Sequence, residues 1–253
     1  MKKSTFLLGA AVIIMTGPAG AADMPMKARV AAPIVAPAFS WTGCYIGVHA
    51  GGGAVRSSYT DGFNDAKDYG NGGVAGGQIG CNYQTGVFVF GIEGEGYWSG
   101  MKAQQEFSIP ADGEGFFSSV RNKYDYTVAG RFGVTYERAF IYGKAGWAWG
   151  KHDFAFTGQD CTSCNIYSEF GSATLNGPLF GVGVEYAFAP NWTVKGEYNY
   201  INYGLSPVNF AFIDCGGSCN GTFTNTFSAE KHIFKFGVNY LFNFGPAPVV
   251  AKY

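Results

Sequence analysis

The side chains best placed to do chemistry are acids and bases at alternate positions within otherwise apolar stretches. Glu93 and Glu95 are separated by a single residue, and so are Lys195 and Glu197. Side chains alternate between the two faces of a β-strand, so each pair lies on one face of its strand. The same parity along the chain predicts an interior set of five acids and four bases: Glu93, Glu95, Asp125, Glu185, Glu197, Arg131, Lys144, Lys195 and Lys235.

Nearly matched charges on one face predict a network of ion pairs inside a closed sheet. A barrel of eight strands has an interior just wide enough for side chains to fill, so these groups are expected to pair across the lumen. Such pairs fix the strand register more than they stabilise the fold, because burying each ion costs several kcal/mol. The alternative is a path for protons or ions. Acidic and basic side chains that neutralise one another in a narrow interior are expected to block ion conduction.

The six cysteines form three candidate pairs in an oxidising compartment. If Gly51 faces Gly73 across a hairpin, Cys44 falls within one residue of Cys81 on the same face, which predicts a disulfide. The alternative is two free thiols facing lipid, because directly opposed strand cysteines often strain a bridge. Two further pairs are each expected to close a small loop, with a zinc site made by all four cysteines as the alternative: Cys161 with Cys164, and Cys215 with Cys219.

The three histidines indicate no active site or metal centre. His49, His152 and His232 have no metal-ligand spacing, and no nucleophile, base and carboxylate are grouped around them. The glycine cluster at 51–53 is followed neither by a helix nor by a Lys-Ser/Thr pair, so it does not predict a phosphate loop. The sequence therefore predicts a protein that is not an enzyme and has no metal or obligatory cofactor.

The elements that must position the charged set are strands. Period-two alternation recurs at 41–51, 73–83, 87–98, 124–136, 140–150, 178–188, 192–203 and 230–242. About eleven residues is the length of a tilted membrane strand. Tight turns at 84–86, 137–139 and 189–191 alternate with long connections at 52–72, 99–123, 151–177 and 204–229. The pattern predicts an all-β, eight-stranded antiparallel up-and-down transmembrane β-barrel over 41–242, with short periplasmic turns and long extracellular loops.

The aromatic face of each strand is expected to meet lipid. In the last strand Phe234 and Phe236 lie opposite Lys231 and Lys235. The alternative is a soluble sandwich or lipocalin, whose apolar face points inward. The aromatic face is the more continuous one, and rings gather near strand ends as an interfacial girdle requires, including all five tryptophans: Trp41, Trp98, Trp147, Trp149 and Trp192. Aromatic residues make up 17% of the chain, charged residues only 14%, and the mean hydropathy is +0.02.

The two ends of the chain are predicted to be a signal peptide and tail segments. Lys2 and Lys3, an apolar run over 6–15 and a small-residue stretch predict a signal peptide over 1–21. An Ala/Pro-rich periplasmic tail is expected over 22–40 and a second tail over 243–253. Removing the two lysines changes the formal net charge from -1 to -3. No basic cluster remains that could neutralise a series of phosphates, so nucleic acid is excluded as a partner.

Several motifs resemble one family. They are Trp41-Thr-Gly-Cys-Tyr-Ile-Gly47, Gly76-Gly-Gln-Ile-Gly-Cys-Asn-Tyr-Gln84, Gly181-Val-Gly-Val-Glu-Tyr186 and Lys195-Gly-Glu-Tyr-Asn-Tyr200. They are similar to the small alphaproteobacterial outer-membrane proteins of the porin family and OmpA-like barrel superfamily, which include surface antigens and hemin-binding proteins. The resemblance implies an integral outer-membrane location, contact with membrane lipid and lipopolysaccharide, and insertion by the barrel assembly machinery. That machinery reads a terminal aromatic residue, here Phe242 or Tyr253.

We expect a surface or structural protein of the Gram-negative envelope with a lumen plugged by charge. One alternative is a binding module whose extracellular loops capture hemin or a surface ligand. Residues that could then supply iron ligands or stacking rings are Tyr59, Tyr69, His152, Tyr167 and Phe223. The other alternative is a narrow porin.

Overall fold

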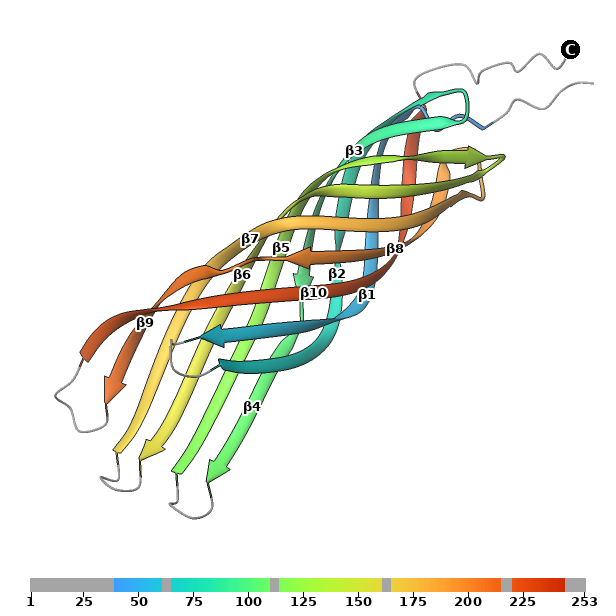
Figure 1. Ribbon diagram of the computed structural model, residues 1–253. Helices are drawn as coiled ribbons and strands as arrows, with labels where there is room; N and C mark the ends of the chain where they lie inside the picture. The colour runs from blue at the N-terminus through green and yellow to red at the C-terminus, as the bar shows by residue number, and fades with distance from the viewer. Residues whose placement is uncertain (1–38, 61–64, 110–113, 161–164, 215–219, 244–253) are drawn as a thin grey trace, which may run out of the picture. The chain divides into compact units, whose positions relative to one another are not determined.

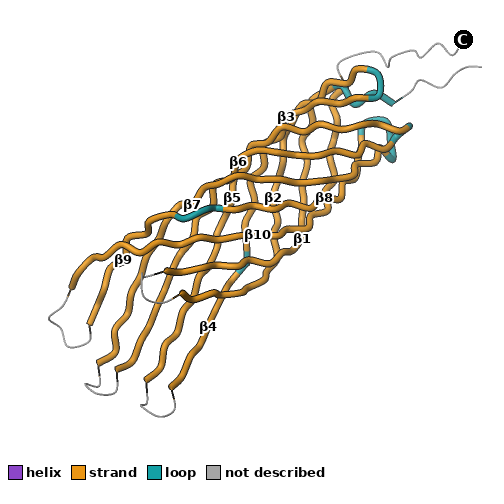
Figure 2. The backbone as a smooth tube through the Cα atoms, in the orientation of Figure 1, coloured by secondary structure: helices purple, strands orange, loops and turns teal. Residues whose placement is uncertain are grey.

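The computed structural model describes residues 39–60, 65–109, 114–160, 165–214 and 220–243 (Figure 1). The expected signal peptide, almost all of the first tail and nearly all of the second lie outside the described residues, as do Cys161, Cys164, Cys215 and Cys219. Figure 2 shows that nearly all of the described backbone is strand. No helix among the described residues is long and apolar enough to cross a bilayer.

Ten strands make one antiparallel sheet. They are β1 (Gly43–Thr60), β2 (Asp65–Thr85), β3 (Phe88–Ser99), β4 (Lys102–Ile109), β5 (Glu114–Tyr136), β6 (Ala139–Asp160), β7 (Asn165–Ala187), β8 (Trp192–Asn202), β9 (Ser206–Asp214) and β10 (Asn220–Asn243). β1 pairs with both β2 and β10, so the sheet closes. β3 and β4 share the neighbours β2 and β5, while β8 and β9 share β7 and β10. Each of these pairs is one interrupted barrel strand, and the predicted eight-stranded barrel is confirmed.

The strands extend further than predicted only at their ends away from the short turns. Near the short turns their ends lie within a few residues of the predicted ones. Away from the turns β6 runs to Asp160 instead of residue 150, and β7 begins at Asn165 instead of residue 178. The long connections are thus mostly paired hairpins, since Asp160 faces Asn165 across the ladder. Continuing the ladder satisfies backbone N–H and C=O groups that a free loop would leave to water, and this outweighs the low strand propensity of the Gly and Ser residues there.

The closed sheet opens beyond its middle. Pairing between β2 and β4 is confined, among the described residues, to Gly70 with Ala103 and Asn71 with Lys102. Further along, β4 still pairs with β5, and β2 with β1. We call the part of the sheet beyond these pairs the hairpin lobe. It has β2 and β4 as its edges.

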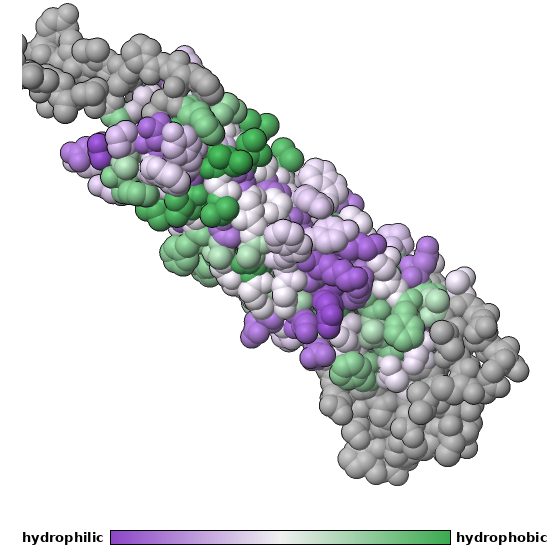
Figure 3. Space-filling view, turned by 180° about the vertical axis from the view of Figure 1, so that it is seen from behind, coloured by the Kyte–Doolittle hydropathy of each residue, from purple (hydrophilic) through white to green (hydrophobic). Residues whose placement is uncertain are grey.

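The faces are those predicted. Phe234 and Phe236 are 61% and 72% exposed, whereas Lys235 between them is 1% exposed. The same alternation runs along β3 and β8. Figure 3 shows hydrophobic side chains over the barrel toward its short-turn end and a strongly hydrophilic patch further along. Exposed apolar side chains around the closed part of the sheet are what a lipid-facing surface requires.

One tryptophan departs from the expected girdle. Trp98 and Trp192 are well exposed, but Trp41 is only 1% exposed. Its ring packs against Phe140 inside the barrel, with centroids 5.3 Å apart. Its backbone N–H donates to Gln84 Oε1 at 2.8 Å. The prediction that all five tryptophans lie at the lipid interface is wrong for Trp41, because this residue precedes β1 and folds inward to fill the end of the lumen.

Candidate functional site

The charged side chains come together in the lumen from six strands. β3 supplies Glu93 and Glu95, β5 Arg131, β6 Lys144, β7 Glu185, β8 Lys195 and Glu197, and β10 Lys235. Register brings partners to the same level, because Glu185 faces Lys195 and Glu197 faces Lys235 on neighbouring strands. Each of these side chains belongs to a residue at most 4% exposed. We call them, together with Asp125 and Lys231 described below, the charged layer.

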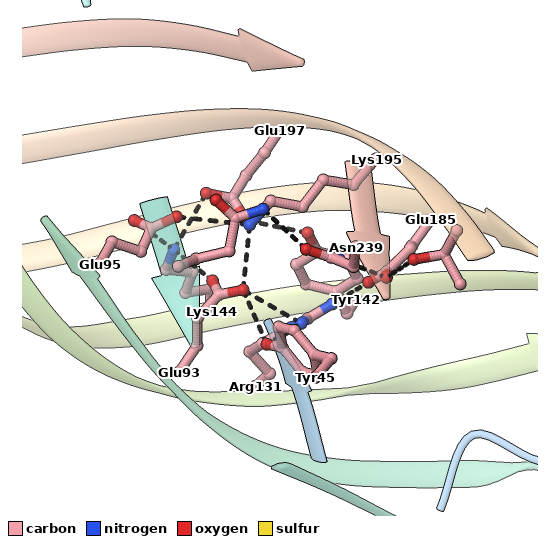
Figure 4. Close-up of polar contacts among 12 residues, drawn as sticks. Tyr45, Glu93, Glu95, Arg131, Tyr142, Lys144, Glu185, Lys195, Glu197 and Asn239 are labelled. Carbon is pink, nitrogen blue, oxygen red and sulfur yellow. Dashed lines mark hydrogen bonds and ion pairs between the residues drawn. The ribbon is translucent and has the colours of Figure 1, made fainter. Parts of the chain in front are cut away.

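Three lysines share three carboxylates at the centre of this layer (Figure 4). Lys144 Nζ lies 2.8 Å from Glu93, 2.9 Å from Glu95 and 2.9 Å from Glu197. Lys195 reaches the same three carboxylates at 3.0 to 3.5 Å. Lys235 reaches Glu95 at 2.7 Å and Glu197 at 3.2 Å. The carboxylate oxygens lie within 4.8 Å of one another, a spacing that suits a metal ion, but the ammonium groups already supply the compensating charge.

Arg131 forms the end of the layer nearer the short turns. Its Nη2 lies 2.6 Å from Glu185, and its Nη1 lies 3.2 Å from Glu93 and donates to the Tyr45 hydroxyl. The guanidinium stacks over the Tyr142 ring at 4.0 Å. Thr193 and Asn239 donate to the remaining Glu185 oxygen at 2.5 and 2.7 Å. Buried charge is tolerated here because polar neighbours satisfy most of its hydrogen-bonding capacity, although Arg131 Nε has no hydrogen-bond partner among the described residues.

Asp125 has a partner that the sequence reasoning left out. Lys231 Nζ lies 2.7 Å from its carboxylate, and the Tyr203 hydroxyl donates to the same oxygen. Lys231 is 0% exposed and shares the inward parity of Lys235, so the parity rule contained the signal. With Lys231 included, five acids face five bases, and the charged layer is formally neutral.

Apolar layers enclose the charged layer on both sides. Toward the short turns Trp41, Val89, Phe140 and Ala187 pack together. On the hairpin side the interior is filled by a larger apolar cluster, including Met101, Leu175, Val208, Phe154, Phe156, Phe210 and Phe227. Phe154 and Phe227 have ring centroids 4.5 Å apart. No charged side chain of the layer therefore meets water through an open lumen at either end of the described barrel.

Cys44 and Cys81 are joined by a disulfide on the outer face. They face each other directly across β1 and β2, with Cα atoms 3.9 Å apart. The pairing predicted from hairpin register is present.

The histidines and expected loop ligands are placed differently. His152 is 1% exposed, its Nδ1 lies 3.0 Å from the Gly150 carbonyl, and its ring packs edge-on against Tyr203. The expectation that His152 is a loop ligand for hemin is wrong, because the strand extends past it and turns it inward. Tyr69 is 66% exposed. Tyr59, Tyr167 and Phe223 lie in β1, β7 and β10, and their side chains are outside the description.

A closed antiparallel barrel with an apolar exterior and a neutralised ionic interior defines an integral outer-membrane β-barrel protein. A family profile for the outer membrane protein beta-barrel domain matches residues 14–242, and the chain belongs to that family. It is 35% identical to the 31 kDa outer-membrane immunogenic protein of Brucella melitensis, over 95% of this chain and 100% of that protein. It is 32% identical to the 22 kDa outer membrane protein of Rhizobium leguminosarum, over 67% of each chain. A solved structure, the outer membrane protease OmpT from Escherichia coli, aligns with a TM-score of 0.48 at 11% identity, covering 82% of this chain and 99% of that one.

Proposed function

We propose that the protein is a sealed, non-conducting barrel that serves as a surface and structural component of the outer membrane and presents four paired hairpins outside the cell. One observation carries the proposal: the charged layer is enclosed between apolar layers. An ion entering from either side must first cross a packed apolar interior, where an unpaired charge costs many kcal/mol. It must then displace ammonium and carboxylate groups that already neutralise one another.

The proposal includes no catalytic step and no bound hemin. The inward placement of His152 and the ammonium groups among Glu93, Glu95 and Glu197 support this. It also includes insertion by the barrel assembly machinery through Phe242, an outward-facing aromatic residue near the end of β10.

Planar-bilayer recording tests the seal. The wild-type chain is expected to give no channel steps. The triple variant Phe154→Ala, Phe210→Ala, Phe227→Ala empties the hairpin-side apolar layer and leaves the charged layer unchanged. It is expected to remain silent, because the charged layer and the short-turn apolar layer still close the lumen. Adding Trp41→Ala and Phe140→Ala, which empty that second layer, together with Lys144→Met, Lys195→Met and Lys235→Met is expected to produce cation-favouring steps, because carboxylates then line a path that neither apolar layer closes. Heat-modifiable migration on gels verifies that each variant is folded. Reproducible channel steps from the wild-type protein would contradict the proposal.

A further inference from the structure

The hairpin lobe has an unguarded edge along β4. Beyond Ala103 this strand pairs with β5 on one side, while its described pairing with β2 ends at Gly70 and Ala103. Figure 1 shows β4 running on past that point, apart from the β1–β2 hairpin. Sheet edges are normally protected by lysine, proline or a bulge. The sequence of 104–109, Gln-Gln-Glu-Phe-Ser-Ile, contains neither lysine nor proline, so this edge is open to a further strand.

A buried carboxylate beside this edge has no counterion. Asp68 on β2 is 8% exposed. Its Oδ2 accepts a hydrogen bond from Ser118 Oγ at 3.1 Å, but its Oδ1 has no partner among the described residues. Each of the other buried acids in the described part of the chain belongs to the charged layer and has a base within ion-pair distance. Burial raises the pKa of the Asp68 carboxyl, as expected for an acid without a nearby cation.

Ser57 adds a second unsatisfied group at the same place. It faces Asp68 directly across the β1–β2 ladder, and both side chains are buried on the inner face of the lobe. Ser57 is 4% exposed, and its Oγ has no hydrogen-bond partner among the described residues. The neighbouring interior is apolar and includes Val55 and Val120. Polar atoms in such surroundings are unfavourable unless a hydrogen-bonding group reaches them.

The chemistry of these oxygens suits an organic cation better than a metal ion. Asp68 gathers two hydroxyl groups around its carboxylate, namely Ser57 opposite it and Ser118 bonded to it. One carboxylate and two hydroxyls fall short of the roughly six to eight oxygen ligands that Ca²⁺ takes. A lysine ammonium carries three N–H donors, and an arginine guanidinium carries five. Either group could satisfy Asp68 Oδ1 and Ser57 Oγ together.

The charge around the edge also favours a basic partner. The stretches 65–69, 104–109 and 114–118 contain four acids and one base, namely Asp65, Asp68, Glu106 and Glu114 against Lys67. A second copy of the chain would bring the same acidic edge, and its own 104–109 stretch has no base to offer. A basic segment of a different protein would be attracted by this charge. Its backbone would continue the ladder of β4.

We propose that the β4 edge of the hairpin lobe captures an extended, basic segment of another protein by strand addition, with one lysine or arginine of that segment pairing with Asp68. The inference rests on the proposed function, since it requires the lobe to lie outside the cell. Main-chain hydrogen bonds supply the affinity of strand addition, and alternate side chains supply its specificity. The inward face of the captured segment is apolar apart from its base, to match the lobe interior, and its outward face is polar.

The probe is the labelled peptide acetyl-Thr-Val-Thr-Lys-Thr-Val-Thr-amide, which as a strand presents valine, lysine and valine on one face and threonine on the other. Its binding to the full chain, refolded in detergent, is followed by fluorescence anisotropy at low ionic strength. Saturable binding is expected. Norleucine in place of the peptide's lysine should weaken binding about tenfold, because a charged hydrogen bond is lost. N-methylation of alternate amides removes donors from the peptide backbone and should abolish binding.

Two single variants test the role of the buried carboxylate. Asp68→Asn should weaken binding of the lysine peptide about tenfold, because the same charged hydrogen bond is lost from the other side. It should leave binding of the norleucine peptide unchanged. Asp153→Asn removes an outward acid and is the matched control, expected to stay within about twofold of wild type because salt and water screen an exposed charge.

A reversible crosslink tests the role of the open edge. Tyr69 and Gln104 are the next positions in the register that pairs Gly70 with Ala103, and both are exposed. In the variant Tyr69→Cys, Gln104→Cys, oxidation should hold β2 against β4 and prevent peptide binding, and reduction should restore it. The wild-type chain keeps its own cysteines and controls for the effect of the reductant.

Equal affinity of wild type and Asp68→Asn for the lysine peptide would overturn the proposal, as would equal binding of the N-methylated peptide. Binding that the oxidised crosslink leaves intact would overturn the assignment to the β4 edge. Sedimentation showing dimers that the crosslink abolishes would assign the edge to a second copy instead. Gel migration verifies that each variant is folded. Channel recording on the same samples tests the sealed barrel independently, so failure of the edge and failure of the seal give different results.

Discussion

The membrane-level lumen and the interior of the hairpin lobe are lined by the same strands with the same parity, yet they are filled in opposite ways. On β6 the inward Lys144 lies between outward Ile141 and Trp147. A few residues further along the same strand, the inward residues are Phe154 and Phe156, and the outward ones include the ion-paired Asp153. β10 shows the same inversion, with Lys235 inward at membrane level and Phe227 inward in the lobe.

The inversion follows from the solvent outside each region. Against lipid, an apolar side chain gains little by turning inward, because acyl chains are as apolar as a protein core. The interior is then free to hold polar groups that define the register. Against water, burying aromatic rings is favourable at about 25 cal/mol per Å² of apolar surface. Thus the girdle marks the level at which the ordinary rule of apolar inside and polar outside resumes.

The largest effect is expected from breaking the charged layer. Lys144→Met keeps the side-chain length but leaves Glu93, Glu95 and Glu197 with one cation fewer. Removing one partner of a buried ion-pair network costs about 3–5 kcal/mol. Urea unfolding in lipid vesicles measures the free energy. Lys123→Met, which removes the exposed pair with Asp153, is the control and should cost at most about 1 kcal/mol. Equal losses in the two variants would show that the lumen pairs act like surface pairs.

Phe154→Ala in the lobe is expected to lower the free energy of unfolding by about 3 kcal/mol, because the substitution leaves a cavity in a packed apolar interior. The loss should be local. Amide exchange should accelerate in the lobe segments of β6, β7 and β9 while the girdle-level strands stay protected, because the lobe opens along its β2 and β4 edges. Ser172→Ala, an outward change in the same lobe, is the control. Uniform acceleration along all strands would show that lobe and barrel unfold as one unit.

This contrast also explains what the sequence could and could not predict. Parity predicted the lumen ions, because charged residues such as Glu93 and Glu95 stand out against an apolar face. Hairpin register predicted the Cys44–Cys81 pairing. The lobe was not predicted as strand because many of its outward residues are Ser, Thr and Asn, which are also typical of loops, and because the polarity inverts without a change of period. Lys231 lies near that inversion, between the ionic and apolar interiors, which is why its role as the fifth base was overlooked.

The smallest effect concerns the exposed pair between Lys123 and Asp153, which lies beyond the girdle. The hydrogen bond from Lys123 lowers the pKa of the Asp153 carboxyl below its ordinary value. A carboxyl whose folded pKa is depressed stabilises the fold above its unfolded pKa, and this contribution disappears as the pH falls through the lowered folded value. Lys123→Gln should raise the Asp153 pKa, measured by carbon-13 carboxyl titration in micelles, and should change unfolding at neutral pH by no more than about 0.5 kcal/mol, because both groups are well exposed. An Asp153 pKa that is the same in Lys123→Gln as in wild type would show that the bond from Lys123 is not what lowers it.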